Sequence, residues 1–343
     1  MSDDAGFRRD QLVGLTPEQR EAVTSDARRL LVRATAGSGK THVLTLRILR
    51  RVTEGEVGAD QVLAMTFTRK AGDELRRRLY RAGVRDLRAG TFHRAALSLV
   101  TRYREDHHLR ALTLETNRRR LVGALAAQLR TDKVMSLDDW QLPRVEQEIG
   151  WALSQGFDGA GYAKNARRLR RSAPLAPAQF ADLLDRYVGY CASRGVMDFD
   201  LLLSEATSLL RDDPDVRAAF RHQTRAVFVD ETQDMNPLQL TLLREMAGDD
   251  PDLFCVGDPN QSIYGFNGAS PQVMVDIVTT WPDTVVLDLT RNHRSTAHIV
   301  AVADTLLEAG AAGLTPAREG GDVPMVRGYD TDEDEARHVA TWL

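Results

Sequence analysis

The segment at 34–41, Ala-Thr-Ala-Gly-Ser-Gly-Lys-Thr, restricts the fold of this chain more than any other feature. It fits the phosphate-loop pattern Gly-x-x-x-x-Gly-Lys-Ser/Thr, except that Ala34 stands at the first position. The apolar residues 30–32 predict a short buried strand before it, and the apolar spacing of 41–49 predicts a helix that stops near Gly55. A glycine turn before a helix is the alternative interpretation, but the Lys-Thr pair at the correct offset favours a phosphate site.

In this context the loop predicts contacts to a nucleoside triphosphate. Successive backbone N–H groups and the helix N-terminus would face the phosphates. Lys40 would reach the β- and γ-phosphates, and the Thr41 hydroxyl would ligate Mg²⁺. The remaining ATP contacts are expected from Ala36, Gly37, Ser38 and Gly39.

A second motif at 227–234, Val-Phe-Val-Asp-Glu-Thr-Gln-Asp, ends an apolar strand with an acidic pair. Acidic residues often end parallel strands, so this motif alone is weak evidence. Together with the phosphate loop it is strong evidence for a nucleotide site. Asp230 would hold Mg²⁺ through water, and Glu231 would act as the general base that polarises the attacking water. Gln233 and Asp234 are either coupling residues or members of a turn.

The order of the predicted elements indicates an α/β fold. Strands are expected at 30–32, 62–67, 226–230, 253–257 and 285–289, with a short one that ends at 91. Strands that alternate with helices indicate a parallel sheet with helices on both faces. Residues 1–94 and 196–284 are predicted to form this domain, 95–195 an inserted helical domain, and 285–343 the incomplete beginning of another domain.

Composition is typical of a large enzyme rather than a secreted or membrane protein. The chain has 343 residues and a net charge of -4, which suggest two or three domains and no uniform basicity. Its two cysteines, Cys191 and Cys255, lie far apart, so neither a disulfide framework nor a zinc site is expected. No apolar run reaches membrane-spanning length, so a cytoplasmic location without membrane contact is expected.

Three loops that follow strands carry residues suited to nucleic acid. The segments 66–68 and 90–93 lie at the carboxyl edge of the predicted sheet, where ligands bind. The polar loop 256–269 contains Tyr264 and Phe266, which neither a strand nor a helix period would bury. Exposed rings stack on unpaired bases, at roughly 1–3 kcal/mol per base. The alternative is that these rings fold back onto the core.

The order of these motifs resembles the UvrD/Rep branch of superfamily 1 DNA helicases. The matching stretches are 15–23, 37–41, 66–68, 90–93, 230–234, 261–265 and 292–295. The resemblance implies a RecA-like ATP-binding domain that carries a helical insertion, followed by the start of a second RecA-like domain. It also implies ATP-dependent movement on DNA in the 3′-to-5′ direction.

The resemblance assigns roles at the nucleotide. Gln19 would read the adenine edge, although Thr16 and Gln19 also fit a helix capping box, and both roles can coexist. Gln261 would sense the γ-phosphate, and Arg294 would act as an arginine finger. His42 and His293 replace the family's adenine-stacking Arg and Tyr, so nucleotide affinity is expected to depend on pH near 6.5.

The resemblance also assigns contacts to DNA. Phe67, Tyr264 and Phe266 would contact or stack on single-stranded DNA, with Phe266 standing where Trp is usual. Thr91 and His93 would lie near its backbone.

Two functions follow from these motifs. The first is the motor half of an ATP-dependent helicase that acts on single-stranded or partly duplex DNA in repair, replication or recombination. Family members carry further C-terminal motifs that this chain lacks, so a second polypeptide that supplies them is an expected partner. The alternative is a non-unwinding, ATP-responsive DNA-binding module that acts with another helicase or nuclease subunit.

Overall fold

The computed structural model describes residues 9–171, 173–265, 268–307 and 313–342. The chain divides into two compact units. The first comprises Met1–Ala34 and Gly39–Leu289, and the second comprises Thr35–Ser38 and Thr290–Leu343.

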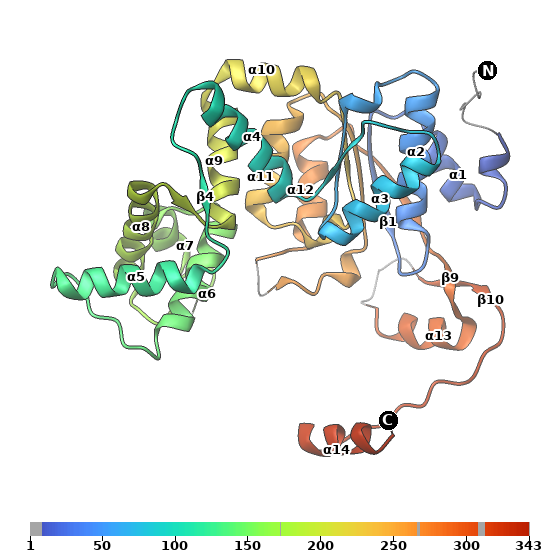
Figure 1. Ribbon diagram of the computed structural model, residues 1–343. Coiled ribbons are helices and arrows are strands. Elements are labelled where there is room, and N and C mark those ends of the chain that lie inside the picture. The colour runs from blue at the N-terminus through green and yellow to red at the C-terminus, as the bar shows by residue number, and fades with distance from the viewer. Residues whose placement is uncertain (1–8, 172, 266–267, 308–312, 343) are drawn as a thin grey trace. The chain divides into compact units, whose positions relative to one another are not determined.

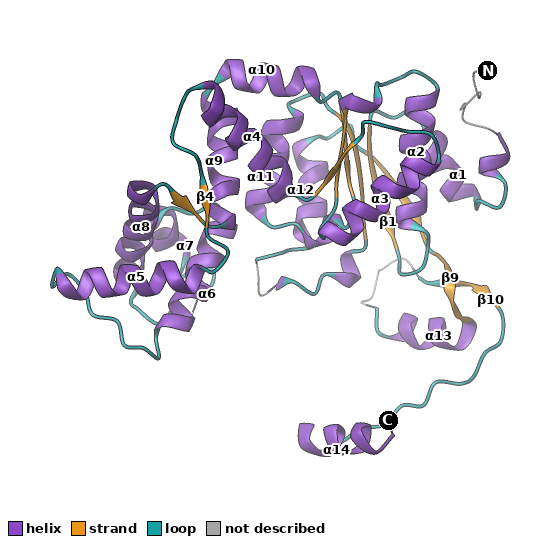
Figure 2. Ribbon diagram, in the orientation of Figure 1, coloured by secondary structure: helices purple, strands orange, loops and turns teal. Residues whose placement is uncertain are grey.

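A six-stranded sheet, in the order β3-β2-β6-β7-β1-β8, is the centre of the first unit (Figures 1 and 2). Its strands are β1 (Arg29–Ala34), β2 (Val62–Met65), β3 (Arg88–Gly90), β6 (Ala226–Val229), β7 (Asp252–Gly257) and β8 (Val285–Leu289). All five strand pairs are parallel. Because β2 and β6 are buried at every residue, both faces of the sheet are covered, as parallel strands require.

Alternate residues of the strands belong to two apolar clusters, one on each face of the sheet. In β1, Leu30 and Val32 belong to one cluster and Leu31 to the other. The first cluster is completed by side chains of α1 (Pro17–Thr24), α2 (Lys40–Thr53) and α3 (Arg69–Arg81). The second is completed by side chains of α4 (Phe92–Asp106), α9 (Phe199–Asp212), α10 (Pro214–Gln223), α11 (Pro237–Ala247) and α12 (Gln272–Thr280). The predicted α/β fold with helices on both faces is therefore confirmed.

The helical insertion has an apolar core of its own. It contains α5 (Arg118–Thr131), α6 (Leu142–Ser154), α7 (Gly159–Asn165) and α8 (Pro177–Arg194). The rings of Tyr162 and Phe180 lie 4.5 Å apart in this core, and Tyr187 is fully buried beside them. The chain enters and leaves through two short parallel strands, β4 (Thr113–Leu114) and β5 (Val196–Met197).

Two expected boundaries differ from the structure. The insertion was expected to begin at 95, but Ala96 and Val100 of α4 pack in the cluster beneath the sheet, so α4 belongs to the sheet domain. A new domain was expected from 285, but β8 pairs with β1 from Leu30↔Val285 to Ala34↔Leu289. The first unit therefore continues to Leu289.

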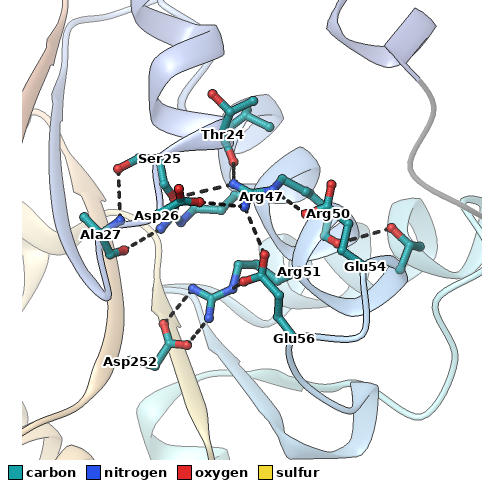
Figure 3. Close-up of polar contacts among 12 residues, drawn as sticks. Thr24, Ser25, Asp26, Ala27, Arg47, Arg50, Arg51, Glu54, Glu56 and Asp252 are labelled. Carbon is teal, nitrogen blue, oxygen red and sulfur yellow. Dashed lines mark hydrogen bonds and ion pairs between the residues drawn. The ribbon is translucent and has the colours of Figure 1, made fainter.

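Arginines on α2 fix the helix that follows the phosphate loop (Figure 3). Arg47 is 1% exposed and donates to the carbonyl oxygens of Ala22, Ser25 and Ala27 at 2.8–2.9 Å. Burial lowers the pKa of Arg47 to about 10, so it stays charged at neutral pH. Arg51 donates to the carboxylate of Asp252, at the start of β7. These bonds tie α2 to the turn after α1 and to the sheet.

The second unit contains β9 (Arg291–Thr296) and β10 (Thr315–Arg318), a parallel pair, with α13 (Ala297–Thr305) against them. A further helix, α14 (Asp332–Trp342), follows. Short 3₁₀ helices elsewhere are η1 (Arg9–Leu12), η2 (Ala59–Gln61), η3 (Thr232–Asp234) and η4 (Pro259–Gln261). Within the described ranges, no helix combines the length and apolar character needed to cross a membrane.

Candidate functional site

The phosphate loop contains two glycines in the left-handed region. Gly37 has φ +69° and Gly39 has φ +88°, and α2 begins at the next residue, Lys40. A Cβ added at Gly39 would lie 2.9 Å from Nε2 of Gln19 and would displace the end of that side chain, but glycine is favoured there chiefly for its backbone angle. The loop thus has the conformation in which backbone N–H groups can form an anion cradle.

Gln19 closes the capping box that the sequence suggested for α1. Its Oε1 accepts from the N–H of Thr16 at 3.0 Å, and its own N–H donates to Thr16 Oγ1 at 3.2 Å. The carbonyl end of the side chain therefore serves the cap, while the amide end lies on the side of Gly39. A contact between Gln19 and adenine stays a prediction.

The acidic pair at the end of β6 meets the start of α2, although about 190 residues separate them in the chain. The Thr41 hydroxyl donates to Asp230 Oδ2 at 3.2 Å, and Lys40 Nζ lies 3.5 Å from Glu231 Oε2. The parallel sheet produces this meeting, because the carboxyl ends of β1 and β6 lie at one edge.

The oxygens of Thr41 and Asp230 suit a hard divalent cation. Asp230 is 4% exposed, and its burial, together with the charge of Glu231, raises its pKa to about 6. A bound cation would offset that cost. In the described part of the chain, no group of three or more His, Cys, Asp or Glu side chains is placed to hold a metal ion by itself. The donor set therefore fits Mg²⁺ held by few protein ligands together with phosphates and water.

A chain of hydrogen bonds connects Glu231 to Gln261. Gln233 Nε2 donates to Glu231 Oε2 at 2.9 Å, and Gln233 Oε1 accepts from the N–H of Asp258 at 2.9 Å. Gln261 Nε2 then donates to Asp258 Oδ2 at 2.6 Å. Gln233 thus lies in the turn η3 and, through Asp258, also connects the predicted site residues Glu231 and Gln261. Asp258 was not among the predicted site residues, although its position directly after β7 is typical of a ligand-binding residue.

Glu231 has an unusual backbone conformation for a residue with a side chain. Its φ is +53°, in the left-handed region that favours glycine. Its N–H donates to Asp230 Oδ1 at 3.0 Å, which holds the backbone in this turn. Strained backbone of this kind is concentrated at functional sites.

Four of the five residues predicted to contact DNA line one cleft of about 1190 Å³: Phe67, Thr91, His93 and Tyr264. The Phe67 and Tyr264 rings lie 4.6 Å apart at 33° and are both half-buried. They pack against one another at the cleft wall, and neither belongs to an apolar core cluster. Phe266 lies outside the described residues.

Thr91 and His93 have defined roles at the start of α4. Thr91 Oγ1 accepts from the N–H of Arg94 at 3.2 Å and caps the helix, which leaves its hydroxyl proton available to an acceptor in the cleft. The His93 ring meets Phe199 edge-on at 5.2 Å. Burial lowers the pKa of His93 to about 4, so the ring is neutral at physiological pH.

The cleft is also lined by residues outside the predicted DNA contacts. Arg69 and Arg94 add positive charge to it. Arg118, from the insertion, also lines it and donates to Asp198 Oδ2 at 2.6 Å. Trp151 of α6 contributes a ring. The run of arginines at 118–120 was a signal for Arg118, whereas helical spacing alone does not distinguish Trp151 as a cleft residue from a core residue of the insertion.

Asp234 lies at the cleft and is influenced by the acidic pair. It lines the cleft and is 7% exposed, and its Oδ1 has no hydrogen-bond partner among the described residues. Burial and the charge of Glu231 raise the pKa of Asp234 to about 6. This carboxyl therefore lines the cleft and is also influenced by the charge of Glu231.

In the second unit, the segment at 292–295 contacts the phosphate loop. Asn292 Nδ2 donates to the carbonyl oxygen of Ala36 at 2.8 Å, and the His293 N–H donates to that of Gly37 at 2.9 Å. The N–H of Arg294 donates to Asn292 Oδ1 at 2.8 Å, and the Arg294 side chain is exposed. Its role as an arginine finger stays a prediction.

The titration of His42 is shifted from its ordinary range. Burial, followed by the charge of Arg78, lowers the pKa of His42 below 6.5. Any contribution of this ring to a pH dependence of nucleotide affinity therefore falls at lower pH than the sequence suggested.

Comparison with known proteins gives one consistent family. The sequence profile of the UvrD/REP helicase N-terminal domain matches residues 15–281. The ATP-dependent DNA helicase UvrD2 of Mycobacterium tuberculosis (strain ATCC 25618 / H37Rv) is 35% identical over 96% of this chain and 49% of its own length. UvrD1 of the same strain is 32% identical over 96% and 44%. The putative ATP-dependent DNA helicase YjcD of Bacillus subtilis (strain 168) is 30% identical over 94% and 42%. The chain thus spans about half the length of the curated relatives it matches.

Proposed function

This chain belongs to the UvrD/REP helicase family, and from that premise we propose that it is the ATP-binding motor half of a DNA helicase. The observation that carries the proposal is the meeting of Lys40 and Thr41 with Asp230 and Glu231 at one edge of the sheet. The cleft that Phe67 and Tyr264 line gives single-stranded DNA a place in the same unit.

The proposed domains follow the family's arrangement with the boundaries observed above. A RecA-like domain would comprise the first unit without its insertion, and the insertion would be a helical domain entered at β4 and left at β5. Residues from 290 onward would begin a second RecA-like domain.

Each residue of the candidate nucleotide site has a proposed part in ATP hydrolysis. Bound Mg²⁺–ATP would supply the scissile phosphate bond and the Lewis acid that polarises it. Lys40 would hold the phosphates, and Thr41 and Asp230 would hold the cation. Glu231 would accept a proton from the attacking water while Gln233 keeps its carboxylate oriented. Gln261 and Arg294 would respond to the γ-phosphate.

Movement on DNA would follow from the connection between the two sites. Asp234 responds to the charge of Glu231 and lines the cleft, so a change at the nucleotide can alter the cleft electrostatically. The 3′-to-5′ direction and a role in DNA repair, replication or recombination come from the resemblance to the family.

The test is ATP hydrolysis by the purified chain with and without single-stranded DNA. We expect turnover that DNA stimulates and that Lys40→Ala abolishes, because Lys40 is the cation of the loop. Lys164→Ala, at an exposed lysine of the insertion, is the matched control and should behave as the wild type. Binding of ATP and DNA without turnover would contradict the motor and support the ATP-responsive DNA-binding module instead.

A further inference from the structure

A second hollow of about 400 Å³ lies at the edge of the sheet. It is bounded by β3, the edge strand, and by α4 and α10, which both pack on α9 (Figure 1). From Thr91 to His107, α4 contributes residues at helical spacing, and α10 contributes one face from Val216 to Gln223. The hollow is therefore a groove between two helices, and apart from Thr91 and Arg94, which also line the DNA cleft, its residues have no role assigned above.

The floor of the groove is apolar, aliphatic except for the ring of Phe220. Leu87 is buried, and Leu99, Val216 and Phe220 are half-buried where they pack against the second core cluster. Apolar surface that remains accessible in a concave site is suited to apolar groups of a ligand.

The walls of the groove are basic. Four arginines line it, Arg76, Arg88, Arg94 and Arg102, against one acidic residue, Asp106. Arg88 donates to Thr224 Oγ1 at 2.7 Å, yet its Nε is buried and has no partner among the described residues. The described residues also offer the Arg94 guanidinium no hydrogen bond or ion pair. Within the described ranges, the groove thus has one buried donor without a partner, Arg88 Nε, and the exposed cation of Arg94 beside an apolar floor. Arg76 and Arg102 pair with Asp73 and Asp106 at the surface.

We propose that this groove binds an acidic peptide segment of a partner protein. Apolar side chains of the peptide occupy the apolar floor, and its carboxylates pair with the arginines. The face of α4 from Thr91 to His107 spans about 24 Å at about 1.5 Å per residue, which an extended peptide of about seven residues covers. The proposal does not depend on helicase activity.

The chemistry of the groove favours a peptide over nucleic acid. Single-stranded nucleic acid binds to ring faces on which bases stack. The Tyr103 ring at the groove is already stacked on His107, with centroids 4.1 Å apart, and Phe220 packs into the core. The aliphatic side chains of the groove are instead suited to contacts with leucine or phenylalanine side chains of a bound peptide.

The peptide would also influence the DNA cleft. Arg76, Gly90, Thr91 and Arg94 line both hollows. Carboxylates bound to Arg76 and Arg94 would neutralise charge that faces the cleft. We therefore expect saturating peptide to weaken binding of single-stranded DNA several-fold, and DNA to weaken the peptide equally.

The test starts with a display library of random heptapeptides, selected on the full chain. We expect enrichment of sequences that combine Asp or Glu with Leu, Ile or Phe. A fluorescein-labelled copy of the most enriched peptide is then titrated by polarisation against two variants. Ala219→Trp fills the groove and Arg102→Glu reverses a wall charge, and each should weaken binding at least tenfold.

Matched controls separate a groove effect from a general one. Ala218→Trp places the same ring on a neighbouring exposed position of α10 outside the groove, and Arg120→Glu reverses an exposed charge of the insertion. Both should bind peptide as the wild type does. Ala219 and Arg102 are exposed, and Arg102→Glu tests the site should the tryptophan variant fail to fold.

Three outcomes would overturn the proposal. The library could show no acidic enrichment, or the selected peptide could bind both groove variants as tightly as the wild type. Alternatively, without peptide, the groove variants could lose affinity for an oligo-dT strand, which would make the groove part of the nucleic-acid path. Unchanged DNA affinity at saturating peptide would remove the proposed coupling.

Discussion

Among single residues, Glu231 has the clearest chemical assignment. Its carboxylate faces Lys40 at 3.5 Å and is oriented by Gln233 at 2.9 Å. Glu231→Gln keeps the shape but removes the ability to accept a proton. We expect ATP affinity to change little and turnover to fall by about 10²–10⁴-fold.

The measurement is phosphate release together with binding of a fluorescent ATP analogue. Glu105→Gln, at an exposed position of α4, is the control and should retain full turnover. If Glu231→Gln hydrolyses ATP at the wild-type rate, the base lies elsewhere.

His93 predicts a pH dependence of stability. Its pKa is about 4 in the folded protein and about 6.5 in an unfolded chain. Between these values the unfolded state binds the proton and the folded state does not. The contribution is therefore fully present above pH 6.5 and is lost as the pH falls toward 4, by about 2–3 kcal/mol.

Unfolding free energies from pH 7 to pH 4.5 test this for the wild type and His93→Gln. The wild type should lose stability more steeply, because glutamine does not titrate. Parallel profiles for the two proteins would contradict the assigned burial of His93.

Candidate site residues could be predicted from the sequence where they belong to one short, continuous motif. Lys40, Thr41, Asp230 and Glu231 were recognised from spacing within two short segments, and the sheet brings them together. Asp258 had a signal but no assigned role, because its importance lies in a contact with Gln261 that only the folded loop creates.

Among the elements, α2 depends on a buried cation. Arg47 donates to the carbonyl oxygen of Ala22 in α1 and to those of Ser25 and Ala27 in the turn that follows (Figure 3). Arg47→Leu would leave these acceptors buried and unsatisfied. We expect the free energy of unfolding to fall by about 3–5 kcal/mol.

Denaturant titration measures this loss. Arg28→Leu is the matched control, because Arg28 is 57% exposed and pairs only at the surface with Asp250. It should change the free energy of unfolding by about 1 kcal/mol or less. Equal effects of the two substitutions would show that Arg47 is not a structural anchor.

The strands were predictable, whereas the extent of the insertion was not. Apolar runs with period-2 burial or full burial mark strands, and all six strands of the sheet were located within a few residues. The apolar spacing of Phe92, Ala96 and Val100 is the same whether a helix packs on a sheet or on other helices. Sequence periodicity therefore could not assign α4 to the correct core.

At the scale of the whole molecule, the two units differ in how many of their apolar side chains are buried. All three apolar clusters come from the first unit. Among the described residues from 290 onward, Asn292 and Val300 are the buried side chains, while Leu306 and Trp342 are each more than three-quarters exposed.

A chain that ends at Leu289 should therefore keep its main thermal transition. We expect the midpoint to move by about 4 °C or less, the shift that about 1 kcal/mol produces in a domain of this size. Circular dichroism of the truncated and the full chain measures it. Loss of cooperative unfolding in the truncated chain would show that the first unit depends on the second.

The strand order also has a consequence for the time course of folding. β1 lies between β7 and β8, and its first pair joins Arg29 to Leu253. At about 5–20 residues per second, a ribosome needs roughly 10–45 s to reach that partner after β1 has been made. During that period β1, an apolar strand, has no partner strand in the nascent chain. The pairs of β1 with β7 and β8 can therefore form only after those strands have been made, and a chaperone that shields β1 during synthesis should raise the yield of folded protein.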